Sequence, residues 1–159
     1  MKFFISNDIR KNQLLKLIIV FTLIYFLMLW ITNLLLYMEI GLDYASVVKY
    51  YRGAEEEFRQ PKSYLGLLQE SHFHFFSMAI ILVTLNHLIL FTGISGRSKL
   101  IIILSSFSSA LGDIMSGWLI RYVAPQFAYL KIVSFLVLQI SFLLLIYINM
   151  KYLYPKDSS

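Results

Sequence analysis

Four long apolar runs constrain this sequence more than any other feature. Each is long enough, or nearly so, to cross the hydrocarbon core of a bilayer as a helix. The runs are continuous and separated by polar turns, which favours helices over strands. We therefore predict an all-α polytopic membrane protein, a four-transmembrane-helix bundle forming a single membrane domain over residues 1–159. The predicted spans are residues 14–37, 72–92, 100–120 and 127–150, with an outer loop over residues 39–71.

Composition supports a membrane location and excludes several classes of function. Of the 159 residues, 58% are hydrophobic and only 14% are charged, too apolar a balance for a soluble domain of this size. The formal charge of +5 lies at the ends of the apolar runs and forms no patch, so no nucleic-acid partner is expected. The chain has no cysteine, which excludes disulfides, thiolate metal sites and c-type haem attachment. It also has no phosphate-binding loop and no glycine-flanked nucleophile.

Charge placement predicts the orientation of the spans. The basic amino-terminal tail, the turn at Arg97 and Lys99, and the carboxy-terminal Lys151 share one side, while the acidic 39–71 loop lies on the other. By the positive-inside rule both termini are cytoplasmic. The first apolar run is too long for a cleavable signal peptide and no small-residue cleavage site precedes Glu39, so we interpret it as a signal anchor.

The outer loop contains signals for short helices. Asp43 can cap a helix that runs through Tyr51 and stops near Gly53. Ser63 can cap a second segment, 64–69, that leads into the next span and is expected to lie along the interface.

The third predicted span carries small residues at helical spacing and one carboxylate. Ser105, Ser109, Gly112 and Ser116 would let another helix approach closely. Asp113 lies among them, and a lone carboxylate in a span costs several kcal/mol unless it is paired or protonated. Counting from the outer ends of their spans, Asp113 and Lys131 lie at similar depths, about two turns in. A structural ion pair between Asp113 and Lys131 is the favoured interpretation, and a proton-accepting carboxylate is the alternative.

All three histidines lie at the start of, or within, the second span. His72 and His74 fall at the outer interface and His87 lies roughly 20 Å deeper. Imidazoles at two depths on one span are typical of proteins that bind haem b, so His72, His74 and His87 are candidate cofactor ligands. No other span offers a second axial imidazole. The haem interpretation therefore requires a homodimer, a partner subunit, a five-coordinate iron, or ligation by Met78 or Met115.

Two other interpretations of these histidines remain open. Glu70, His72 and His74 could form a metal site at the outer surface, although residues two apart on a helix point in different directions. Alternatively, His72 and His74 are interfacial residues that hydrogen-bond to loop carbonyls or lipid headgroups. His87 would then be a packed histidine, with Asn86 and Gln139 as polar neighbours at its depth.

Several short motifs resemble a family of small four-helix proteins of bacterial inner membranes, whose members often carry the name of a translation elongation factor. The motifs span roughly residues 40 to 130. They are Tyr50-Tyr51-Arg52-Gly53, Glu55 to Glu57, Lys62-Ser63, Glu70 to Met78, Asn86-His87, Gly112-Asp113 with Trp118, and Pro125 to Ala128. The resemblance implies an inner-membrane location and singles out His72, His74, His87 and Asp113 without giving them roles. The family pattern leads us to expect a small residue at position 86. Asn86 departs from that pattern, and the departure favours the interpretation in which His87 packs against a neighbouring helix. A role in translation does not fit so apolar a chain.

Together these features lead to one favoured function and two alternatives. We expect an accessory or scaffolding component of a membrane complex, with no enzyme activity of the isolated chain, present as a homodimer or within a larger assembly. The first alternative is a cytochrome-b-like electron-transfer subunit. The second is a metal-binding membrane protein that uses Glu70, His72 and His74.

Overall fold

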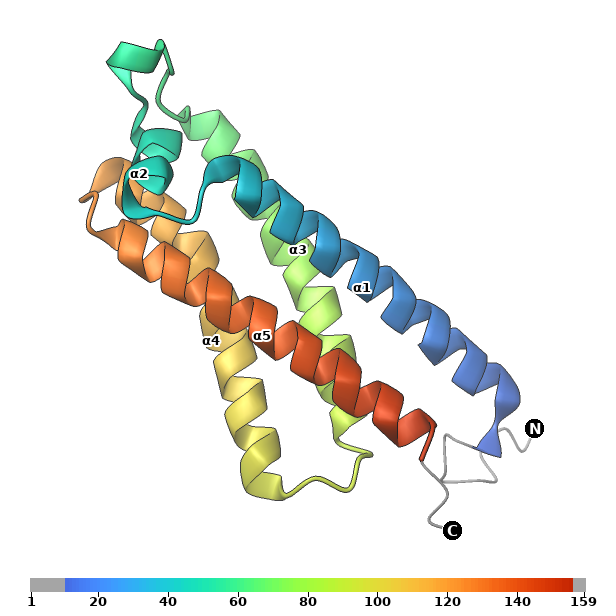
Figure 1. Cartoon of the computed structure of the whole chain (residues 1–159). Coiled ribbons are helices and arrows are strands. Elements are labelled where there is room, and N and C mark those ends of the chain that lie inside the picture. The colour runs from blue at the N-terminus through green and yellow to red at the C-terminus, as the bar shows by residue number, and fades with distance from the viewer. Residues whose placement is uncertain (1–10, 156–159) are drawn as a thin grey trace.

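A computed structural model describes residues 11–155 of the chain, and these residues form an all-helical bundle with no strand (Figure 1). The helices are α1 (Gln13–Ile40), α2 (Tyr44–Arg52), α3 (Tyr64–Ile89), α4 (Gly96–Tyr122) and α5 (Phe127–Leu153), with a 3-10 turn, η2, at Glu55–Glu57. α1, α3, α4 and α5 are each long and apolar enough to cross a membrane. The chain is a multi-pass membrane protein.

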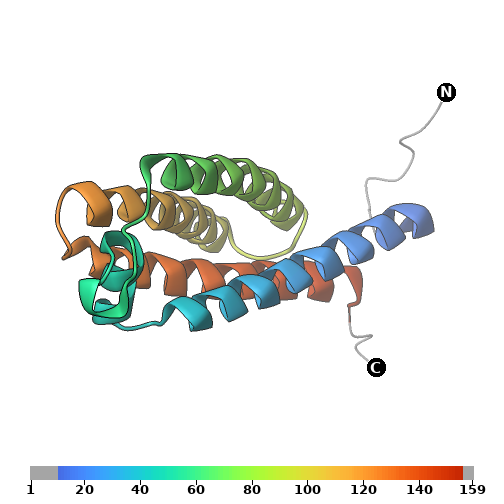
Figure 2. The same ribbon diagram turned by 90° about the horizontal axis from the view of Figure 1, so that it is seen from above.

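The four long helices form two layers of two. Viewed from above, α3 and α4 lie in one layer and α1 and α5 in the other (Figure 2). α4 and α5 share the most extensive interface, whereas α1 packs mainly against α5 and α3 mainly against α4 and α5. α2 covers one end of the bundle, the α2 end. At the opposite end the first turn of α1 meets the end of α5, where the Lys16 ammonium lies 3.7 Å from the centre of the Tyr154 ring.

Small residues explain why α4 and α5 pack so closely. A Cβ atom added at Gly112 would lie 2.6 Å from the Ser134 hydroxyl oxygen on α5. Further along the same interface, the hydroxyl oxygens of Ser105 and Ser141 are 3.5 Å apart. The small-residue stripe of the third span therefore faces another helix, as its spacing predicts.

The α2 end folds around a small apolar cluster of its own. The Asp43 carboxylate caps α2 by accepting from the Ser46 amide, and Gly53 ends the helix with a φ of 82°. At Gly53 a side chain would also collide with the Arg59 carbonyl, 2.6 Å from an added Cβ. The cluster beneath consists of Val47, Tyr51, Leu67, Ile120 and Ala128. This cluster holds α2 against α4 and α5.

The second span begins earlier than its apolar composition predicts. Ser63 caps a helix through the Gly66 amide as expected, but that helix continues without a break through Glu70 and Ser71 to Ile89. α3 therefore starts at Tyr64, where the sequence predicts a separate short segment before a span from residue 72. The reason is that backbone hydrogen bonds determine helix continuity, and polar residues such as these do not interrupt them. α1 and α4 also extend beyond their predicted bounds at both ends, and α5 does so at its carboxy-terminal end, in each case by one to four residues.

Candidate functional site

A polar cavity of about 420 Å³ lies at the α2 end of the bundle. Residues from α1, α2, α3, α4 and α5 and from the segment before α3 meet there. They are Asn33, Leu36, Tyr37, Ile40, Tyr50, Tyr51, Lys62, Gly66, Gln69, Glu70, His74, Met78, Asp113 and Lys131. Its volume falls within the range of small-molecule sites in proteins. It is the place where charged, aromatic and imidazole side chains converge, and we call it the charged cavity.

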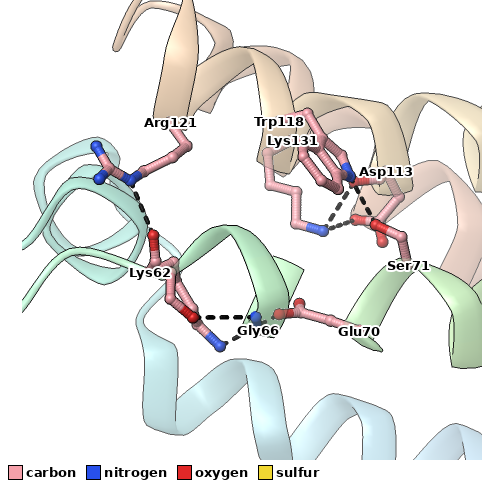
Figure 3. Close-up of polar contacts among 9 residues, drawn as sticks. Lys62, Gly66, Glu70, Ser71, Asp113, Trp118, Arg121 and Lys131 are labelled. Atoms are coloured by element: carbon pink, nitrogen blue, oxygen red, sulfur yellow. Dashed lines mark hydrogen bonds and ion pairs between the residues drawn. The ribbon is translucent and has the colours of Figure 1, made fainter. Parts of the chain in front are cut away.

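The deepest charges of this cavity are Asp113 on α4 and Lys131 on α5. Only 7% of Asp113 and 5% of Lys131 are exposed. The Lys131 ammonium nitrogen lies 2.9 Å from Asp113 Oδ1 and also donates to the Asp113 backbone carbonyl at 2.9 Å (Figure 3). The two opposite charges thus compensate each other within the membrane-spanning part of the protein.

A second ion pair lies nearer the surface of the cavity. The Lys62 ammonium is 3.2 Å from Glu70 Oε2 and 4.4 Å from the centre of the Tyr50 ring. The Lys62 backbone is fixed as well, because its carbonyl accepts from Arg121 Nε at 2.9 Å (Figure 3). Partial burial opposes the charged form of Lys62, but Tyr50 and the Glu70 carboxylate outweigh it and raise the pKa of this ammonium. Lys62 therefore stays protonated at the edge of the cavity.

His74 lies between the charged cavity and a second, more apolar one. The second cavity, of about 450 Å³, opens between α1 and α3. We call it the lateral cavity, and its lining is Leu29, Thr32, Asn33, Leu36, Phe73, His74, Ser77, Met78 and Phe142. Asn33, Leu36, His74 and Met78 line both cavities. The half-buried His74 ring makes no hydrogen bond with any residue between 11 and 155, so both of its nitrogens can bind a ligand.

The structure does not bring the three histidines together. His72 is exposed, with its ring edge-on to that of Phe73, and does not line either cavity. His87 is exposed near the other end of α3, where its ring is edge-on to Phe91 at 5.3 Å between centroids. Met78 is buried beside the cavities and Met115 is exposed. A second axial imidazole for a haem iron held by His87 would therefore have to come from another chain.

The predicted metal ligands also separate. Glu70 and His74 are one helical turn apart and line the charged cavity, as their spacing predicts, but His72 points to another face because α3 is already helical there. Within residues 11–155, no three His, Cys, Asp or Glu side chains lie close enough to hold one metal ion. Two protein ligands are fewer than the three or four typical of a zinc site.

The aromatic walls of the charged cavity are not among the features predicted from the sequence. Tyr37 is buried, its ring stacks on Phe135 with 3.5 Å between centroids, and its hydroxyl has no hydrogen-bond partner among the described residues. Tyr51 is buried on α2, and this burial raises the pKa of its phenol well above the ordinary value. The pair Tyr50-Tyr51 in a capped helix was a usable signal. Tyr37 gave none, because α1 is apolar on all sides.

Comparison with known proteins identifies one relationship. Residues 41–159, which are 119 of the 159 residues, match the model of the family Aq_1264_TM, described as a transmembrane helical domain. The match covers every element from α2 onwards, and so includes all residues of the charged cavity except those on α1. No curated protein and no solved structure matches the chain.

Proposed function

The chain belongs to the Aq_1264_TM family of transmembrane helical domains, and from that premise we propose that it is an accessory component of a larger complex in the bacterial inner membrane. Its contribution is to bind and position another membrane subunit. No catalytic step by the isolated chain is part of this proposal. The exposed phenol of Tyr25 on α1 carries the argument.

Tyr25 lies where a polar group is costly. It is twelve residues from the start of α1, about 18 Å along the helix and so near the middle of the span. Its side chain is 70% exposed, and it makes no hydrogen bond with any residue between 11 and 155. Hydrocarbon offers a hydroxyl no partner, whereas polar side chains in spans commonly hydrogen-bond to a neighbouring helix. A helix of another subunit beside α1 would satisfy this phenol.

The loose attachment of α1 supports the same proposal. Of its 28 residues only Ile19, Leu23 and Tyr37 are buried, whereas α5 buries twelve residues in 27. A span with so little internal contact presents most of its surface to lipid or to another protein. Ile18, Phe21, Tyr25 and Met28 are exposed, line neither cavity and form one stripe of that surface, with spacings of three and four residues.

Photo-crosslinking in cells tests this proposal. A photoreactive amino acid at Phe21, which is exposed, lies one turn from Tyr25 and lines neither cavity, should form an adduct with a different integral membrane protein. The adduct should weaken when Tyr25→Phe removes the hydroxyl. The same probe at Val133, an exposed position on α5, serves as the matched control and should label lipid only. Adducts only to lipid, or only to another copy of this chain, would overturn the accessory role.

The orientation belongs to the same proposal. Arg97 and Lys99 lie at the start of α4, and α2 with its acidic neighbours Glu55 to Glu57 lies at the opposite end of the bundle. With the basic end cytoplasmic, both termini face the cytoplasm and the α2 end faces outward.

The haem alternative is favoured by the placement of His87. Because this imidazole is exposed on α3, a second chain could supply the opposite axial ligand and hold a haem between subunits. Protein expressed with ample haem should then show a Soret band that His87→Ala removes and that is lost when the complex is dissociated. A colourless complex would exclude this alternative.

The metal alternative is reduced to Glu70 and His74, because His72 faces elsewhere. Glu70 already pairs with Lys62, so an ion would compete with an ammonium for this carboxylate. The metal content of the purified protein, compared with that of the Glu70→Gln variant, tests this alternative. Equal metal contents would exclude the site.

A further inference from the structure

We propose that the charged and lateral cavities form one binding site for a zwitterionic membrane lipid of the phosphoethanolamine type. The headgroup would lie in the charged cavity, and the acyl chains would leave between α1 and α3. This inference is independent of the accessory role, because it concerns the interior of the bundle and needs no partner protein.

The polarity of the two cavities changes along their length as an amphiphile requires. The charged cavity holds two lysines, two carboxylates and three tyrosines. The lateral cavity is lined mainly by Leu29, Leu36, Phe73, Met78 and Phe142. They adjoin at Asn33 and His74, and the lateral cavity lies on the side where α1 and α3 have little mutual contact. A water-soluble ligand would use the first cavity only, whereas a lipid would use both.

The charge balance of the site favours a zwitterion. Lys62 and Lys131 are offset by Glu70 and Asp113, so the four charges sum to zero before a ligand binds. A headgroup with a net charge would leave one charge uncompensated in a partly desolvated site. A headgroup carrying one phosphate and one ammonium can pair with a group of each sign and leave the total unchanged.

Groups suited to both ends of such a headgroup are available. The buried Tyr37 hydroxyl has no partner within residues 11–155, and the His74 ring nitrogens are free of hydrogen bonds there. Lys131 uses two contacts on Asp113, which leaves one ammonium proton. These three groups can donate to a phosphate. Glu70, whose Oε2 alone contacts Lys62, can receive the ammonium at Oε1.

Native mass spectrometry of the full chain tests the proposal. The detergent-purified protein is exposed to equimolar phosphatidylethanolamine and phosphatidylglycerol with identical acyl chains. We expect one phosphatidylethanolamine molecule to be retained, with a preference of about tenfold over phosphatidylglycerol, as one charge-assisted hydrogen bond provides. Equal retention of the two lipids, preference for phosphatidylglycerol, or no retention would overturn the proposal.

Three variants and one control link retention to this site. Tyr37→Phe and His74→Leu each remove a phosphate donor and should lower retention of phosphatidylethanolamine several-fold. Glu70→Gln should shift the preference toward phosphatidylglycerol, because it removes the negative charge that pairs with the ammonium. His72→Leu is the matched control, on the same helix but outside both cavities, and should change nothing. An effect of His72→Leu equal to that of His74→Leu would overturn the proposal, and helicity and elution volume verify that each variant folds.

The route of the acyl chains is tested separately. Phosphatidylethanolamine with a photoreactive group midway along one chain should label peptides containing residues 29–36 and 73–78. Uniform labelling around the bundle would contradict exit between α1 and α3.

Discussion

The Lys131 ammonium holds both the side chain and the main chain of Asp113, at 2.9 Å from Oδ1 and 2.9 Å from the backbone carbonyl oxygen. The contact joins α5, about one turn from its start, to α4, about two and a half turns from its end, and both residues are buried there. One lysine thereby neutralises a buried carboxylate and satisfies a carbonyl oxygen in the small-residue interface. The pair links α4 and α5 within their closely packed interface.

Removing one member of this pair should harm the protein more than removing both. Lys131→Met leaves an unpaired buried carboxylate and should lower the free energy of unfolding by about 3–5 kcal/mol. In the double variant Lys131→Met, Asp113→Asn the buried charge is absent, so the loss should be smaller. Denaturation in mixed detergent, followed by helicity, gives both values. A double variant less stable than Lys131→Met would contradict the pairing argument.

Two kinds of sequence feature lead to predictions that the structure confirms. They are the depth of charged residues within the predicted spans and the residues that cap helix ends. Counting from the outer ends of the predicted spans places Asp113 and Lys131 at similar depths, and the structure has them in contact. Asp43, Gly53 and Ser63 mark helix ends through local backbone hydrogen bonds, which do not depend on the rest of the fold. Such local rules and the lengths of the apolar runs are readable without a structure.

The lateral cavity between α1 and α3 could not be predicted from such local rules. In a helix that is apolar all round, periodicity does not tell the packed face from the lipid-facing one, and α1 is such a helix. The stacking of Tyr37 on Phe135 and the exposure of Tyr25 therefore appear only in the structure. Similarly, the separation of His72 from His74 depends on α3 starting at Tyr64, upstream of the apolar run.

Gly117 should tolerate no side chain, because Tyr51 packs directly on it. An added Cβ would lie 2.9 Å from Cε1 of the buried Tyr51 ring. Gly117→Ala should therefore displace α2 from α4 and cost about 1–3 kcal/mol of stability. Gly93→Ala is the matched control, since nothing lies within 4 Å of its added Cβ. Equal stability of the two variants in the same denaturation assay would show that the contact between Tyr51 and Gly117 is loose.

The α2 end should loosen in acid. Hydrogen bonds from the Ser46 hydroxyl and the Ser46 amide lower the pKa of Asp43, and the Lys49 ammonium lowers the pKa of Glu57. A carboxyl group with a lowered pKa stabilises the fold above its unfolded pKa, and that stability is lost as the pH falls through the folded value. Amide exchange in α2, expressed as protection factors, should therefore be constant near neutral pH and fall below about pH 4. Asp43→Asn should show weaker protection at neutral pH and a smaller decrease in acid.

Reporter fusions test the predicted orientation. A fusion after the carboxy terminus should report a cytoplasmic location, and one inserted within Glu55 to Glu57 should report the opposite side. η2 is an exposed turn, so an insertion there should leave the bundle intact. Reporters at the same location would contradict the four-span topology, and exchanged locations would reverse the orientation.

The hydrogen bond between Trp118 and Ser71 should measure how tightly α3 is held to α4. Trp118 Nε1 donates to the Ser71 hydroxyl at 2.7 Å, near the α2 end of both helices (Figure 3). Ser71→Ala leaves the indole N–H without this acceptor and should cost about 1 kcal/mol. Ser77→Ala is the matched control, because its hydroxyl bonds only within α3, to the Phe73 carbonyl at 2.7 Å and more weakly to His74. Unfolding in mixed detergent, followed by tryptophan emission, should separate the two variants, and a loss from Ser77→Ala as large as that from Ser71→Ala would show that the bond contributes nothing specific to this interface.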